Sequence, residues 1–227
     1  MASTIDDLPH SGVVEIDGGH FSGVPRKGRT KADNSDKKDI PKKYQQHRTK
    51  EKASESNPFH PNRRIIMVLR ESFGKKGLGA SKTVVAVCNS ENSANIEGLV
   101  KKYVEKQSTI RSDELSAYGN LKLMGYVHET VNHSEEFSNP KGFNQNQAES
   151  YFSRMRRAAI GIYHRITPKY MLDYAMEMAW REDIRRTDTR GQITQLVHGI
   201  FKAGVSADWC NYCRGNKRQA ELLFTEC

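Results

Sequence analysis

Three short apolar runs near the amino terminus constrain the fold most strongly, because β-branched runs of strand length are buried in sheets. Residues 64–70 (RIIMVLR) and 82–88 (KTVVAVC) are separated by the turn-rich sequence FGKKGLGAS. Residues 13–19 (VVEIDGG) form the third run. We therefore predict three neighbouring strands, of which the second and third form a hairpin.

The run at 13–19 also carries two acids, Glu15 at its centre and Asp17 near its end. Charged carboxylates are almost never fully buried without a partner, because desolvation costs several kcal/mol. Two interpretations remain open. Either the two acids lie on a solvated face, or something positive meets them.

The chain continues with alternating helix and strand patterns. Apolar residues between 96 and 104 recur at helical spacing, and Asn92 or Ser93 can cap this helix. Residues 108–113 and 126–131 have strand patterns, with a short helical segment between them. This order predicts an α/β fold with a sheet of mixed strand directions.

Segment 144–164 (NQNQAESYFSRMRRAAIGIYH) has the clearest helical pattern. The predicted buried stripe consists of Ala148, Phe152, Met155, Ala159 and Ile162. Asn146, Glu149 and Arg156 share a neighbouring face, at offsets of three and seven residues. Thr167 and Pro168 predict the start of a further helix, whose core stripe would be Met171, Tyr174, Ala175 and Met178.

Asp17, Asp113 and Glu149 come from a strand, from the end of a later strand and from a helix. Taken singly, each acid is explained by a turn or a solvated surface. Three carboxylates brought to one point suit a pair of Mg²⁺ ions, which prefer oxygen ligands and act in phosphoryl displacement. A metal site would then explain the acid at the end of the first strand.

The positive charge is concentrated in one segment. The 227 residues have a formal net charge of +9, and residues 24–64 contain thirteen Lys or Arg against five Asp or Glu. This segment has almost no aliphatic residues, so we predict a long basic loop. It is either a solvated linker or an arm that binds phosphate in a salt-dependent manner.

No apolar run approaches the ~20 residues that a spanning helix needs. The start of the chain lacks the pattern of a signal peptide, so a cytoplasmic protein is expected, nucleoid-associated if bacterial. The four cysteines do not suggest a disulfide scaffold. Cys210 and Cys213 are a weak zinc signal, with His198 and Cys227 as conceivable further ligands, and reduced thiols are the simpler expectation.

Four blocks resemble, in order and spacing, the catalytic domain of insertion-sequence DDE transposases of the ISXO type. They are VVEIDGGHFSGVPRK, STIRSDELSAYGNL, GYVHETVNHSEEF and FNQNQAESYFSRMRRAAIGIYHRITPKYMLDYAMEMAWRED, within about residues 12–185. The resemblance implies an RNase H-like fold and cleavage and joining of DNA with two Mg²⁺ or Mn²⁺ ions. It also implies a homo-oligomer in a synaptic complex with DNA.

Carried over residue by residue, the resemblance makes Asp17, Asp113 and Glu149 the metal-binding catalytic triad. Asn146 matches the family's amide before the acid, and Arg156 matches a basic residue two helical turns after it. Both are predicted to contact DNA, as are Arg154, Arg157 and His164. Three roles stay open for His128, His133 and Tyr163: a position at the active-site rim, contact with DNA, or packing.

The sequence departs from the family pattern at three points. Gly18 stands where the family usually has an acid directly after the first aspartate. The basic loop 24–64 is longer than expected. The catalytic strand begins about twelve residues into the sequence, so the family's amino-terminal zinc-ribbon and helix-turn-helix module is expected to be missing.

Together these observations predict an amino-terminal tail (1–11), an RNase H-like catalytic domain (12–185, with the basic loop) and a carboxy-terminal helical extension (186–227). The expected function is DNA transposition. Two alternatives stay open: a nuclease of the same fold that cuts without joining, and a truncated remnant that only binds DNA.

Overall fold

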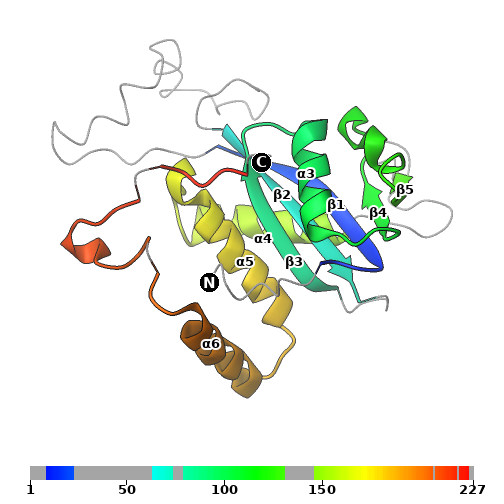
Figure 1. The fold of residues 1–227 in the computed structure, drawn as a ribbon. Coiled ribbons are helices and arrows are strands. Elements are labelled where there is room, and N and C mark those ends of the chain that lie inside the picture. Colours follow the sequence, from blue (N-terminus) through cyan, green and yellow to red (C-terminus); the bar gives the residue numbers. More distant parts are fainter. Residues whose placement is uncertain are drawn as a thin grey trace, which may run out of the picture.

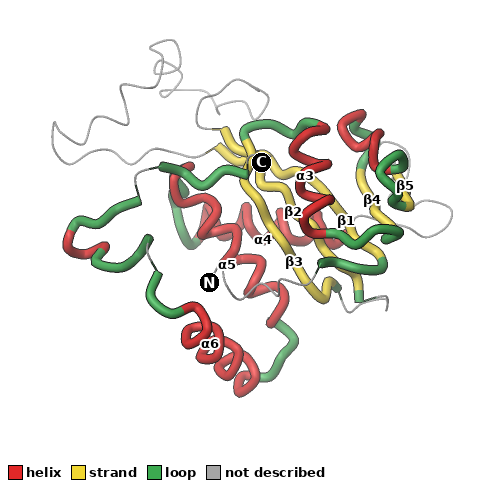
Figure 2. The backbone as a smooth tube through the Cα atoms, in the orientation of Figure 1, coloured by secondary structure: helices red, strands yellow, loops and turns green. Residues whose placement is uncertain are grey.

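The structure of the protein is a computed structural model that describes residues 9–22, 63–73, 79–130, 146–206, 208–218 and 220–224. Its centre is a five-stranded sheet with the strand order β3-β2-β1-β4-β5 (Figure 1 and Figure 2). The strands are β1 (Val13–Ser22), β2 (Arg63–Ser72), β3 (Ala80–Cys88), β4 (Thr109–Ser112) and β5 (Val127–Thr130).

The strand directions are mixed, as predicted. β1 pairs antiparallel with β2, and β2 pairs antiparallel with β3, which confirms the three neighbouring strands and the hairpin. β4 pairs parallel with β1, and β5 pairs parallel with β4. The middle of β2, from Ile65 to Leu69, is buried throughout because both faces of the sheet are covered.

Helices cover the two faces of the sheet and form two hydrophobic cores. Helix α3 (Ser93–Tyr103) packs Ile96, Leu99 and Val100 on the face that includes Val14 and Ile16 of β1. The other face carries α4 (Asn146–Gly161) and α5 (Met171–Ile184). The even and odd positions of β1 therefore face different helices, as the alternation of a strand requires.

Most of the predicted helical details are confirmed. Asn92 is the residue that caps α3, because its side chain accepts a 2.8 Å hydrogen bond from the backbone N–H of Asn95. A 3₁₀ helix (Ser116–Leu121) fills the predicted helical segment between β4 and β5. Another 3₁₀ helix (Pro168–Tyr170) precedes α5. Met171, Ala175 and Met178 of α5 are buried, and Tyr174 is half-buried.

The predicted stripe of α4 is correct except at its end. Ala148, Phe152 and Met155 are buried, and Ala159 is half-buried. Ile162 is 72% exposed, so its assignment to the core was wrong. The helix ends at Gly161, and the N–H of Ile162 closes the last turn onto Ala158 at 2.9 Å. The chain then leaves the helical path, so Ile162 no longer follows the buried face.

The predicted basic loop extends two residues too far, because Arg63 and Arg64 begin strand β2. Both contribute to strand pairing with β1, opposite Ser22 and Phe21. The rest of this loop lies outside the described residues. Its positive charge is established by the sequence alone.

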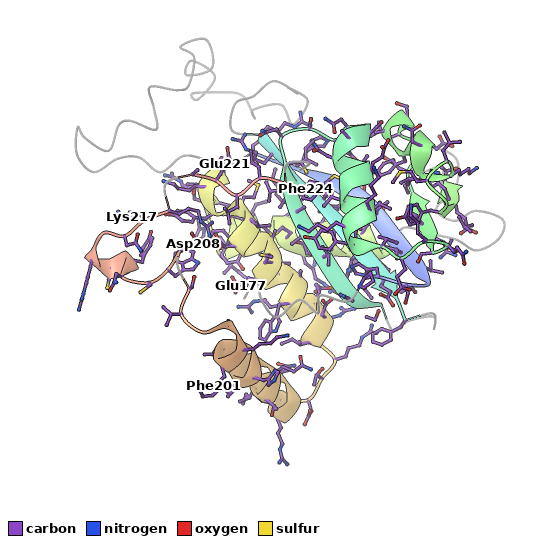
Figure 3. All side chains as sticks on the ribbon, in the orientation of Figure 1. Glu177, Phe201, Asp208, Lys217, Glu221 and Phe224 are labelled. Atoms are coloured by element: carbon purple, nitrogen blue, oxygen red, sulfur yellow. The ribbon has the colours of Figure 1, made fainter. Side chains whose placement is uncertain are left out.

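Beyond α5, helix α6 (Thr189–Ala203) stands apart from the sheet in Figure 1. Its labelled residue Phe201 points away from the body of the molecule in Figure 3 and is 82% exposed. The later part of the chain returns to the sheet: the N–H of Phe224 donates a 2.8 Å hydrogen bond to Val87 of β3. Arg218 also binds Asp173 of α5, at 2.6 and 3.1 Å.

The division of the chain into a catalytic domain and a carboxy-terminal extension stays a prediction. Within the ranges that the structure describes, no helix combines the length and apolar character needed to cross a membrane. The described cysteines, Cys88, Cys210 and Cys213, are free thiols, and Cys227 lies outside the described residues.

Candidate active site

The first two acids of the predicted triad belong to neighbouring parts of the sheet: Asp17 lies in β1, and Asp113 directly follows β4. The two strands run parallel, and Glu15 of β1 pairs with Arg111 of β4, two residues before each aspartate. Both acids are half-buried. Asp17 Oδ1 accepts a hydrogen bond from the N–H of Gly18 at 2.8 Å, and Asp113 Oδ1 accepts one from the N–H of Leu115 at 3.1 Å. The backbone thus fixes both carboxylates.

A further carboxylate, which the sequence analysis missed, belongs to this part of the sheet. Glu91 lies between β3 and α3, and its Oε1 accepts a 2.6 Å hydrogen bond from the hydroxyl of Tyr118. Its carboxylate occupies the space that a Cβ atom on Gly18 would need. A carboxylate from another part of the chain therefore lies directly beside the residue that follows Asp17.

The electrostatics of this cluster reflect its negative charge. Burial raises the pKa of Glu91, Asp113 raises it further, and the hydrogen bond from Tyr118 acts in the opposite direction. The pKa of the buried Tyr118 hydroxyl is also raised, first by burial and then by Glu91, Asp17 and Asp113. Negative charge from all three acids therefore acts on the Tyr118 hydroxyl.

Glu149 lies in the first turn of α4 and is exposed. This turn is attached to the sheet by Glu15, whose Oε2 accepts hydrogen bonds from the backbone N–H groups of Gln147 at 2.9 Å and Ala148 at 3.2 Å. The open question about the acids of β1 is thereby answered for Glu15. It is buried, and the positive end of a helix meets it.

Burial raises the pKa of Glu15 to about 7. The hydrogen bonds from the N–H groups of Ala148 and Gln147 act in the opposite direction, as do the nearby guanidinium groups of Arg111 and Arg70. Desolvation is therefore the larger effect on this carboxyl group.

Helix α4 presents different basic residues on different flanks. The guanidinium of Arg156 lies over the rings of Phe21 and Phe152, at 5.8 and 5.7 Å from their centroids. Arg156 is seven residues, nearly two turns, after Glu149, so the two share a helix face beside β1. On another flank, Arg154 forms an ion pair with Glu182 of α5. Arg157 is exposed.

The remaining predicted residues lie at the margins of this region. Asn146 is exposed and begins α4. His128 Nε2 is 2.8 Å from Ser112 Oγ, beside Asp113. Tyr163 donates a 3.3 Å hydrogen bond to Glu177 of α5. His164 lines a cavity of about 270 Å³ at the far end of α4, together with Phe21 and Met155. His133 lies outside the described residues.

The donor set is chemically suited to Mg²⁺ or Mn²⁺, because every predicted ligand is a carboxylate. In the described part of the chain, no group of three or more His, Cys, Asp or Glu residues lies close enough to hold a metal ion. The structure places Asp17 in β1, Asp113 directly after the adjacent strand β4, and Glu149 in the first turn of α4, which packs against β1, without closing them into one ligand shell. The triad stays a prediction.

The fold and these acids define the class of protein. A mixed five-stranded sheet in this order, flanked by helices, is consistent with an RNase H-like fold. The family model of the ISXO2-like transposase domain matches residues 9–183, which is most of the chain. The protein belongs to this DDE transposase family, as its sequence blocks predicted. No curated protein sequence matches the chain significantly.

Family membership implies transposase activity and DNA binding. It also implies a divalent metal, since DDE transposases typically use one. Which reaction steps the protein catalyses, and with which residues, is a matter of proposal.

Proposed function

We propose that this protein catalyses DNA transposition at a site formed by Asp17, Asp113 and Glu149. It would hydrolyse a phosphodiester at each transposon end, and the freed 3′-hydroxyl would then attack target DNA. One observation carries the proposal: β1 pairs in parallel with β4, with Glu15 opposite Arg111, and this register brings Asp17 of β1 and Asp113, the residue after β4, toward the same part of the sheet. Family membership supports the class of reaction.

In this proposal, Asp17, Asp113 and Glu149 would hold two Mg²⁺ or Mn²⁺ ions. When bound, such ions supply Lewis-acid stabilisation of the attacking and leaving oxygens. Asp17 and Asp113 are oriented by hydrogen bonds from the backbone N–H groups of Gly18 and Leu115. Glu149 is carried on a helix whose first turn is fixed to β1, and its exposed side chain would have to turn toward the two aspartates to complete the site.

Basic residues of α4 would hold the DNA backbone. Arg156 presents its guanidinium from a platform of two aromatic rings, on the face of Glu149, and Asn146 lies one turn before Glu149 on that face. Arg157, Arg154 and His164 are the other proposed contacts. Such contacts to phosphate position the DNA without reading its sequence.

The basic segment 24–64 would add sequence-independent, salt-dependent affinity. We further propose a homo-oligomer that pairs two transposon ends in a synaptic complex, in the cytoplasm and associated with the nucleoid in a bacterial host.

The direct test is nicking of supercoiled plasmid by the full chain in Mg²⁺ or Mn²⁺. The proposal predicts metal-dependent nicking that is lost in Glu149→Gln and in Asp113→Asn. Glu114→Gln is the matched control, because Glu114 is an exposed acid next to Asp113 with no proposed role. Metal-dependent nicking that survives Glu149→Gln would overturn the proposal.

The same assay separates two other functions. The absence of a closed ligand shell among the described residues favours an inactive, DNA-binding remnant, which would bind DNA in low salt and never nick it. A nuclease of the same fold would nick DNA but would not join a supplied 3′-hydroxyl end to a second plasmid. Joined products are therefore the result that singles out transposition.

A further inference from the structure

We propose that Glu15 and Arg70 are positioning residues, which together fix the first turn of α4 and thereby aim Glu149 at the site on β1. This inference rests on the proposed function, because it takes Glu149 as a catalytic residue. It concerns two buried charged residues that the proposed reaction itself does not use.

The two residues hold opposite sides of a single residue of α4. Glu15 Oε2 accepts the hydrogen bond of the Gln147 N–H at 2.9 Å, and Arg70 Nη1 donates a 2.6 Å hydrogen bond to the carbonyl oxygen of Gln147. Glu15 also accepts from the N–H of Ala148 at 3.2 Å. Glu149 follows directly, so its backbone position depends on these three contacts.

The sheet makes this arrangement rigid. Glu15 of β1 and Arg70 of β2 are directly paired in the register of the two strands, and their side chains are 3% and 1% exposed. Arg70 is fixed further by Thr83 Oγ1 at 3.1 Å and by Glu182 of α5 at 3.5 Å. The contacts to Gln147 thus originate from two central strands and not from a loop.

The physical chemistry explains why charged residues are buried here. The first N–H groups of a helix have no partner within the helix, and a carboxylate is the strongest acceptor for them. Buried charged groups rarely stabilise a fold more than apolar residues of similar size would. An apolar residue at position 15, however, would leave the N–H groups of Gln147 and Ala148 without an acceptor. Precise attachment of this helix end therefore accounts for the burial of Glu15 and Arg70.

The first experiment measures amide hydrogen exchange of the full chain without metal, in Glu15→Ala, Glu15→Gln and Arg70→Lys. We expect exchange in the first turn of α4 (residues 146–150) to rise at least tenfold in Glu15→Ala. A smaller rise is expected in Glu15→Gln, whose amide oxygen still accepts. The matched control is Glu221→Gln, because Glu221 is a half-buried acid that binds Arg64 of β2 and makes no hydrogen bond to α4 in the described structure.

The second experiment separates kcat from KM in metal-dependent plasmid nicking. A positioning role predicts that Glu15→Ala lowers kcat at least tenfold with little change in KM for DNA, and that Glu15→Gln restores part of kcat. If Glu15→Ala does not fold, the graded exchange in Glu15→Gln and Arg70→Lys decides the matter.

The two hypotheses fail in different ways. Wild-type exchange and wild-type kcat in the Glu15 variants, with nicking lost in Glu149→Gln, would overturn the positioning role and leave the proposed function intact. Wild-type nicking in Glu149→Gln would overturn the proposed function, and would therefore also remove the catalytic meaning of the contacts between Glu15 and α4.

Discussion

The hydroxyl of Tyr118 donates a 2.6 Å hydrogen bond to Oε1 of Glu91, and the tyrosine side chain is fully buried. This contact connects the 3₁₀ helix after β4 with the segment before α3. It holds the Glu91 carboxylate against Gly18, the residue that follows Asp17 in β1.

Tyr118→Phe removes this donor and leaves a largely desolvated carboxylate without it. We expect the metal-free protein to lose about 1–3 kcal/mol of unfolding free energy, measured by urea denaturation. Combining Tyr118→Phe with Glu91→Gln in a double-mutant cycle should give a coupling of about 1 kcal/mol or more. Purely additive effects would show that the two side chains do not stabilise each other.

The two glycines of β1 are expected to respond differently to alanine. A Cβ atom on Gly19 would overlap the ring of Phe152, which is buried between α4 and the sheet. A Cβ atom on Gly18 would overlap only the end of the Glu91 side chain, which can rotate away at the loss of one hydrogen bond. We predict that Gly19→Ala costs about 2–3 kcal/mol and Gly18→Ala less, by thermal and urea denaturation. The reverse order would contradict the packing described here.

Arg154 and Arg157 of α4 are both proposed DNA contacts, but only Arg154 also forms an ion pair within the described part of the protein. Arg154→Ala breaks the ion pair with Glu182, which remains in contact with Arg70, so a loss of about 1 kcal/mol in stability is expected. Arg157→Ala should change stability by less than about 0.5 kcal/mol. It should weaken DNA binding and reduce the salt dependence by about one unit of slope. Equal losses of stability in the two variants would argue against a structural role of Arg154.

Asp183 gives a pH dependence of stability. Burial raises the pKa of Asp183 to about 6, although the N–H and hydroxyl of Thr83 donate to it at 2.9 and 2.6 Å. Because the raised pKa favours the protonated form in the folded state, its contribution to stability is complete below about pH 4 and is lost as the pH rises through 6.

Asp183→Asn should therefore remove up to about 3 kcal/mol of this pH-dependent change between pH 4 and 7, measured as unfolding free energy. The comparison needs only the difference in slope between wild type and variant. Parallel curves would show that Asp183 titrates in the folded protein as it does in the unfolded chain.

Sequence patterns were sufficient for β2 and β3 because these strands are nearly continuous apolar runs. The hairpin of β2 and β3 and the cap at Asn92 depend on local residues, so they could be predicted. The end of α4 could not, because Gly161 does not interrupt the apolar pattern that continues to Ile162. Arg63 looks like part of a polar loop, yet it pairs with β1 in the sheet.

The candidate site was predictable only where family motifs reached it. Asp17, Asp113 and Glu149 were identified by a resemblance, but Glu91 lies in a polar stretch that reads as a simple turn. The role of Arg70 was hidden because its partner, Gln147, is 77 residues away in sequence. The sequence showed that Glu15 needs a positive partner or a solvated face. Its partner, the first turn of α4, could be identified only from the fold.

The central claim is that Asp17, Asp113 and Glu149 act as one metal-dependent site. The most direct measurement is the nicking rate in Mn²⁺ of Asp17→Asn, Asp113→Asn, Glu149→Gln and the triple variant, each checked for native folding. Residues that act as a unit are not additive, so each single change should lower the rate about as far as the triple change. Single variants that keep wild-type rates, or that lower the rate only in independent steps, would contradict a single site.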